Sequence, residues 1–168
     1  MRTTDPAVDF ASVERSVPHR LPRQGRGRLM PGTLELQRIV YCSQAARPDL
    51  ALAALAEILA VSDRNNRRDG LTGVLLISQG RFFQVLEGAA QDLDRTMNRI
   101  RLDPRHHDVE LVSRRPIKSR RFGQWAMVSA RITPRQQPEI DAVIDHCHTA
   151  PDAAVDAARA LLDHQIAA

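Results

Sequence analysis

Hydrophobic and polar positions alternate along several short segments of the chain and repeat with helical spacing along longer ones. A period of two is typical of a strand, and spacings of three and four residues are typical of a helix. The alternating segments predict five strands, over 39–43, 71–77, 81–86, 109–112 and 122–132. The helical spacing predicts two helices between them, one from Pro48-Asp49 to about Asn65-Asn66 and one over 92–103.

The predicted order β-α-β-β-α-β-β is typical of a ferredoxin-like α+β sandwich extended by one strand. We therefore expect a mixed five-stranded sheet with two helices on one face. Ser78-Gln79-Gly80 predicts a tight hairpin between the second and third strands, and Gly88 predicts the end of the third strand. Apolar positions after Pro138 predict two C-terminal helices, which cover the other face of the sheet or a partner chain.

The chain has 168 residues, which suits one domain with small additions. Arginine, proline and glycine dominate residues 1–34, so we expect a disordered extension there, then a folded domain over 35–132 and a helical cap over 133–168. No apolar run approaches the roughly 20 residues of a membrane helix, and the N-terminus lacks the pattern of a signal peptide. Cys42 and Cys147 form no disulfide framework or zinc spacing. We therefore expect a cytoplasmic protein with reduced thiols and no membrane partner.

The net charge of +4 comes from arginine, since Lys118 is the only lysine. Residues 36–131 hold sixteen basic and ten acidic residues, whereas 132–168 hold two basic and six acidic ones. A basic body can bind nucleic acid, and a ferredoxin-like sheet can stack bases on aromatic side chains such as Phe82 or Phe83. A general preference for arginine explains the same charge without a nucleic-acid partner.

A lone glutamine, Gln84, stands inside the apolar strand 81–86. A buried glutamine has two N–H donors and a carbonyl acceptor, and an unpaired buried polar group costs about 1–3 kcal/mol. Either the fold or a polar ligand must therefore pair with it. Strand alternation places Gln84 on one face with Phe82 and Leu86, and it places Tyr41 on one face of the first strand. A cleft lined by such groups and by the ends of the two helices suits a flat heterocycle edged with carbonyls and ring nitrogens.

Each candidate residue also has an ordinary structural explanation. Tyr41 can be a core phenol with a backbone partner, and Gln84 can be satisfied by backbone at a sheet irregularity. Asn65-Asn66 is typical of a helix C-cap, and Trp125 can simply fill the core. The segment Arg105-His106-His107 can be a solvated turn.

The segment His146-Cys147-His148 has the residue types of a metal site. Adjacent residues on a helix point about 100° apart, so the three side chains are not expected to bind one ion. We therefore expect no metal.

Five ordered motifs resemble the BLUF family of blue-light sensors that use FAD, over about Leu36 to Arg131. The motifs are Arg38-Ile39-Val40-Tyr41-Cys42-Ser43, Asn65-Asn66 with Gly70-Leu71-Thr72-Gly73, Gly80-Arg81-Phe82-Phe83-Gln84-Val85-Leu86-Glu87-Gly88, Asp103-Pro104-Arg105-His106 and Arg121-Phe122-Gly123-Gln124-Trp125-Ala126-Met127. The loop around Ala45-Ala46-Arg47 is about one residue longer than the usual pattern.

The resemblance implies photochemical roles for four residues. Tyr41 would donate an electron and a proton to the excited flavin, and Gln84 would bridge the Tyr41 hydroxyl and the N5/O4 edge of the ring. Gln84 would return rotated or tautomerised and shift the absorption to the red. Trp125 and Met127, expected to share a face of the last strand, would report this change to the strand and the C-terminal helices.

The resemblance also implies residues that hold the flavin. Asn66 would bind the carbonyl edge of the ring, and Asn65 the polar groups beside it. Arg105 would face the pyrimidine carbonyl, with His106 nearby. Ser43 would contact the residues that bind the flavin rather than the flavin itself.

The function implied is a photoreceptor without enzymatic activity that binds FAD non-covalently, FMN being possible. Its signal would pass to an unknown effector protein, and we expect a homo-oligomer. The alternatives are a ferredoxin-like nucleic-acid-binding module, which we disfavour, and a small acylphosphatase-like enzyme, for which a glycine-rich phosphate loop is missing.

Overall fold

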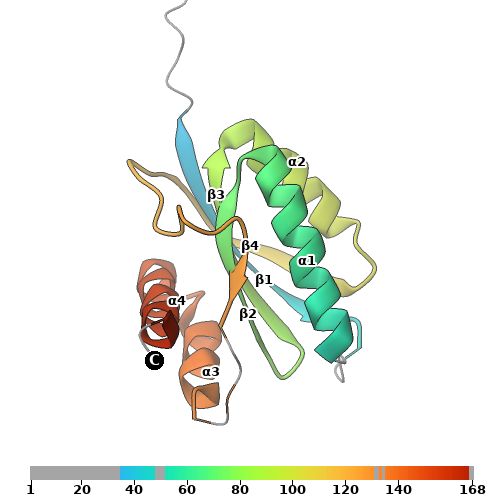
Figure 1. Ribbon diagram of the computed structural model, residues 1–168, viewed down its shortest axis with the longest axis vertical. Coiled ribbons are helices and arrows are strands. Elements are labelled where there is room, and N and C mark those ends of the chain that lie inside the picture. The colour runs from blue at the N-terminus through green and yellow to red at the C-terminus, as the bar shows by residue number, and fades with distance from the viewer. Residues whose placement is uncertain (1–34, 48–51, 131–132, 134, 167–168) are drawn as a thin grey trace, which may run out of the picture. The chain divides into compact units, whose positions relative to one another are not determined.

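The computed structural model describes residues 35–47, 52–130, 133 and 135–166 (Figure 1). The predicted extension over 1–34 and the predicted helix start at Pro48-Asp49 lie outside these residues. Within the described part of the chain, no helix has the length and apolar character needed to cross a membrane.

Five strands form one mixed sheet. They are β1 (Leu36–Ala45), β2 (Thr72–Ser78), β3 (Arg81–Ala89), β4 (His106–Pro116) and β5 (Val128–Ser129). The order across the sheet is β4-β1-β3-β2-β5, with β5 parallel to β2 and the other neighbours antiparallel. The predicted five-stranded ferredoxin-like α+β fold is confirmed.

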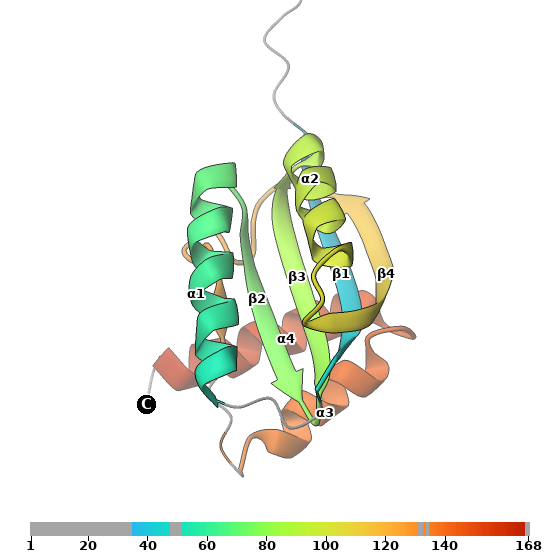
Figure 2. The ribbon, with the colours of Figure 1, turned by 90° about the vertical axis from the view of Figure 1, so that its right-hand side faces the viewer.

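Helices cover both faces of this sheet. Helices α1 (Leu52–Asp69) and α2 (Ala90–Arg101) lie on one face, and α3 (Gln137–His146) and α4 (Pro151–Ile166) lie on the other (Figures 1 and 2). The sequence left open whether the C-terminal helices cover the other face of the sheet or a partner chain. In the structure they cover the other face of the sheet.

Strand alternation sorts the core into two halves. In β3, Phe83 and Val85 pack towards α3 and α4, whereas Phe82 and Leu86 pack towards α1 and α2. Phe82 and Phe83 are 5% and 0% exposed, so neither offers an open aromatic platform on which a nucleic-acid base could stack.

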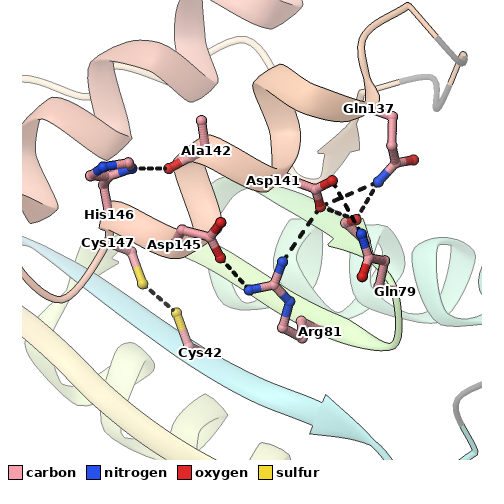
Figure 3. Close-up of polar contacts among 10 residues, drawn as sticks. Cys42, Gln79, Arg81, Gln137, Asp141, Ala142, Asp145, His146 and Cys147 are labelled. Carbon is pink, nitrogen blue, oxygen red and sulfur yellow. Dashed lines mark hydrogen bonds and ion pairs between the residues drawn. The ribbon is translucent and has the colours of Figure 1, made fainter.

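The tight hairpin predicted at Ser78-Gln79-Gly80 is present between β2 and β3, with a two-residue turn. Gln79 and Gly80 have φ angles of 48° and 73°, as a type I′ turn requires. Figure 3 shows the side chain of Arg81, which follows the turn, between two aspartates of α3, Asp141 and Asp145. The tip of the hairpin is therefore attached to α3.

Two predicted element ends, those of α1 and β3, lie further along the chain in the structure. Helix α1 continues past Asn65-Asn66 to Asp69 and stops before Gly70, whose φ of 64° is a left-handed helix end. Strand β3 runs through Gly88 rather than ending there, because Gly88 pairs with Gln37 of β1.

Strand β4 extends well beyond the predicted 109–112. It begins at His106 and ends at Pro116, because β1 offers it a long antiparallel partner. A solvated turn was the alternative explanation for Arg105-His106-His107, and the last two of these residues belong to the strand.

The predicted strand over 122–132 is wrong over most of its described length. Only Val128–Ser129 pairs with β2, and the preceding residues form a loop. The backbone N–H groups of Arg121 and Phe122 donate to the Glu87 carboxylate, at 3.1 Å and 3.0 Å, instead of to a neighbouring strand. Glu87 is fully buried and forms an ion pair with Arg38, with Nη2 and Oε1 2.6 Å apart. This anchored segment, residues 120–127, is called the 120–127 loop below.

Candidate functional site

A cavity of about 110 Å³ lies between the sheet and helices α1 and α2. Six of the residues predicted for the site line it, namely Tyr41, Asn65, Asn66, Gln84, Arg105 and His106. They come from three strands (β1, β3 and the start of β4), from α1 and from the segment between α2 and β4. The structure therefore brings together residues that are far apart in the sequence.

Tyr41 and Gln84 face each other across β1 and β3 as register partners. The Tyr41 hydroxyl donates a hydrogen bond to Oε1 of Gln84, and the two residues are 3% and 5% exposed. Nε2 of Gln84 lies 3.5 Å from Sδ of Met127, which is its only side-chain partner among the residues that the structure describes. A thioether is a weak acceptor, so the amide still has donor capacity for a polar ligand.

Burial raises the pKa of Tyr41 well above its usual range, and the negative charge of Asp103 raises it further. The phenol is therefore protonated at neutral pH. This protonation state is the one that donates to Gln84.

The two asparagines of α1 differ in exposure. Asn66 is 2% exposed, and its Nδ2 donates to the backbone oxygen of Ala126 at 2.8 Å. Asn65 is half-buried at the cavity wall. Neither is a helix C-cap, since α1 ends at Asp69. Asn66 thus connects the cavity to the 120–127 loop.

Arg105 is held by Asp103, with Nε and Oδ1 2.9 Å apart. This pairing lowers the pKa of Asp103 and raises that of Arg105. His106 contacts Ser43, with Nδ1 and Oγ 2.9 Å apart, and its ring lies 5.9 Å from that of Phe82. Ser43 is buried behind His106, consistent with a supporting position.

Trp125 and Met127 do not share a face, contrary to the sequence prediction. Met127 packs towards α1 and α2 and contacts Gln84. Trp125 packs on the opposite side with the core under α3 and α4, where the Arg159 guanidinium lies 4.8 Å from its ring. The alternation rule fails here because these residues belong to a loop.

Several cavity residues were missed by the sequence analysis. Thr96 and Arg99 of α2 line the cavity, with Arg99 Nη2 2.8 Å from Thr96 Oγ1. Thr96 lies one turn from Ile100, so the helical spacing could have found it. Apolar walls come from Ile58, Leu75, Phe82 and Ile100.

The donor set suits a flavin ring. Amides and a guanidinium can pair with carbonyls and ring nitrogens, and aliphatic and aromatic walls can hold a flat apolar ring system. The spare donor capacity of Gln84 points to the same conclusion. These residues therefore fit the group that the sequence motifs imply.

Comparison with known proteins agrees with this geometry. The family described as BLUF, sensors of blue-light using FAD, matches residues 36–128, more than half of the chain. The chain belongs to the BLUF family. A BLUF domain is a sensor that binds a flavin and has no catalytic role of its own.

Among curated relatives, the chain is similar to photoactivated adenylate cyclase subunit alpha of Euglena gracilis, with 35% identity over 102 residues. That match covers 60% of this chain and 10% of the relative, so the chain spans about a tenth of the relative's length. Photoactivated adenylate cyclase subunit beta of the same organism is 37% identical over 93 residues, covering 55% of this chain and 11% of the relative.

Two solved structures show the same fold. The dark state of BlrB, a BLUF protein, has a TM-score of 0.63 and 29% identity, covering 77% of this chain and 97% of BlrB. A bacterial light-regulated adenylyl cyclase has a TM-score of 0.60 and 33% identity, covering 70% of this chain and 36% of the cyclase. BLUF domains thus signal to effector domains or partners.

Proposed function

We propose that this protein is a blue-light photoreceptor whose cavity holds FAD and whose Tyr41–Gln84 pair performs the switch. The hydrogen bond between these two buried side chains carries the proposal. Residues 35–132 would form the flavin-binding domain, and 133–168 the helical cap. When bound, the flavin supplies blue-light absorption and an excited state that accepts an electron.

The cavity residues bind and orient the ring. Asn65 and Asn66 lie on the α1 side, and Arg105 lies on the α2 side. The bond from Asn66 to Ala126 fixes the orientation of the Asn66 amide. With the ring bound, Phe82 and the aliphatic walls would exclude water from the polar contacts and so strengthen them.

The switch consists of the reorientation of one amide. In the structure Gln84 accepts from Tyr41 and directs its NH2 group towards Met127. Loss of the Tyr41 proton and its return would allow Gln84 to come back rotated or tautomerised. A rotated amide would direct Oε1 towards Met127, whose sulfur cannot donate a hydrogen bond. The contact between Gln84 and Met127 would therefore be lost.

The 120–127 loop would carry this change across the sheet. Met127 lies on the flavin side and Trp125, two residues earlier, lies against α3 and α4. Arg159 of α4 stacks on Trp125 and donates to the backbone oxygen of Arg121. Displacement of Met127 would thus move a loop that α4 contacts directly, and α4 would present the signal to an effector protein.

Replacing Tyr41 with Phe tests the switch. The variant loses the hydroxyl that donates to Gln84 but keeps the ring that lines the cavity. Purified wild-type protein is expected to be yellow and to shift its absorption reversibly to the red under blue light. The Tyr41→Phe protein should keep the yellow colour and lose the reversible red shift, as measured by absorption spectra before and after illumination.

Ser78→Ala is a suitable control, because Ser78 lies in β2 outside the cavity and should leave the red shift unchanged. A Tyr41→Phe protein that still switches normally would show that another residue donates. A colourless wild-type protein that retards nucleic acid would instead favour the nucleic-acid-binding alternative. Extraction of the bound chromophore and its chromatography would distinguish FAD from FMN.

A further inference from the structure

Two cysteines that are far apart in the sequence meet on the face of the sheet opposite the flavin cavity. Sγ of Cys42 in β1 lies 2.9 Å from Sγ of Cys147, which caps the C-terminus of α3 (Figure 3). Both are free thiols, Cys147 being fully buried and Cys42 partly buried. The flavin switch described above uses neither residue.

Two more metal-binding side chains adjoin this pair. The donor atoms of Cys42, Cys147 and His148 all lie within 4.8 Å of one another. Oε1 of Glu110 lies 3.7 Å from Nδ1 of His148, and Glu110 pairs with Cys42 in the register of β1 and β4. A cavity of about 280 Å³, lined in part by Cys42, Glu110 and His148, gives access from solvent.

The prediction of no metal concerned His146-Cys147-His148 alone and did not consider Cys42 or Glu110. It assumed that the helix continues through all three residues. Helix α3 ends at His146, and the next two residues lie in a turn. His146 takes no part, because its Nδ1 contacts the backbone oxygen of Ala142 at 2.8 Å (Figure 3).

We propose that Cys42, Cys147, His148 and Glu110 bind a zinc ion that joins β1 to the end of α3. Two thiolates, one imidazole and one carboxylate match the ligands and the tetrahedral number that Zn²⁺ prefers. Zinc–sulfur bonds of about 2.3 Å place tetrahedral sulfurs roughly 3.7 Å apart, so binding needs the sulfurs to separate by less than about 1 Å. A disulfide would use the two sulfurs alone and would give His148 and Glu110 no role.

The test titrates Co²⁺, a coloured substitute for Zn²⁺, into the full chain after removal of any affinity tag and treatment with chelator and reductant. Tetrahedral cobalt thiolate absorbs in the red, where oxidised flavin does not. We expect one Co²⁺ per chain, displaced by one Zn²⁺. Cys147→Ser and His148→Asn should lose this absorption, and Glu110→Gln should weaken binding by roughly tenfold or more. His146→Asn, the matched neighbour outside the ligand set, should bind like wild type.

Absence of stoichiometric binding, or binding that survives Cys147→Ser, would overturn the proposal. So would a chain purified without reductant that has no metal and no free thiol and is 2 Da lighter than its reduced form, since that result identifies a disulfide. The readout is independent of the photocycle, so a failure of the proposed light-sensing function would leave the metal result interpretable.

Discussion

The two faces of the sheet differ in what they bury. Under α1 and α2, the polar side chains of Tyr41, Gln84 and Asn66 are buried beside a cavity. Under α3 and α4, the centre of the sheet buries aliphatic and aromatic side chains such as Val40, Phe83 and Val85. The Arg38–Glu87 ion pair lies at one end of the strands and anchors the 120–127 loop.

This difference suggests a separate role for each face of the sheet. Buried polar groups cost free energy unless they are paired, so the uncharged polar side chains buried beside the cavity indicate a use for them there. A close-packed apolar face transmits small displacements because it has few voids to absorb them. We interpret the cavity face as the sensing side and the face under α3 and α4 as the transmitting side.

The largest expected difference between the two faces is in the free energy of unfolding, when either of two adjacent phenylalanines is replaced. Phe83→Ala removes a fully buried ring from the packed side and should lower the free energy of unfolding by about 3–5 kcal/mol. Phe82→Ala, next to the cavity, should cost clearly less in flavin-free protein but should weaken flavin binding. Denaturant unfolding and flavin titration measure the two effects. Equal losses of stability would contradict the assignment of one packed and one open face.

A smaller effect on the free energy of unfolding is expected where Asn66 connects the cavity to the 120–127 loop. Asn66→Ala deletes the amide that donates to Ala126 and leaves a buried carbonyl unpaired, which should cost about 1–3 kcal/mol. Asn65→Ala is the matched control, since this half-buried neighbour makes no such bond to the loop in the described structure. Denaturant unfolding of both variants compares them. Equal stability of the two would show that the loop does not depend on Asn66.

Strands and helices could be predicted from the sequence where the periodicity of apolar residues was clear. The prediction failed where a side chain, rather than a neighbouring strand, binds the backbone N–H groups. Tyr41 and Gln84 could be placed together because alternation and a buried polar residue are both visible in the sequence. The conformation of the 120–127 loop could not be predicted. It depends on Glu87 accepting two backbone N–H groups, a contact between residues more than thirty positions apart. Trp125 and Met127 lie in this loop, and the alternation of a strand therefore does not predict their opposite orientations.

The contact between Arg159 and Trp125 should matter little for stability and more for signalling. Arg159→Met removes the cation from the ring and should lower the free energy of unfolding by about 0.5–1 kcal/mol. Trp125 is the only tryptophan, so its fluorescence reports the change. We expect the variant to keep the light-induced red shift and to lose the light-induced change in this fluorescence.

Asp163→Asn provides the control for this prediction. It removes the ion pair that Arg159 makes along α4 and leaves the stacking on Trp125 in place. Its light-induced fluorescence change should match that of wild type. A red shift that disappears in Arg159→Met would contradict the separation of sensing from transmission.

The smallest expected effect is a pH dependence of the free energy of unfolding, caused by His106 at the edge of the cavity. Burial lowers the pKa of His106, an effect that Asp103 partly opposes and Arg105 adds to. The unfolded chain therefore binds a proton more readily, and the free energy of unfolding should fall as the pH drops below about 6.5. Unfolding measured from pH 8 to pH 5 should show a shallower fall in His106→Gln. A slope identical to wild type in His106→Gln would rule out this assignment.

The attachment of Arg81 to Asp141 and Asp145 has a mechanical consequence. Helix α3 is fastened to the turn whose outgoing strand bears Gln84, so a rigid tilt of α3 would move that strand and the Gln84 amide with it.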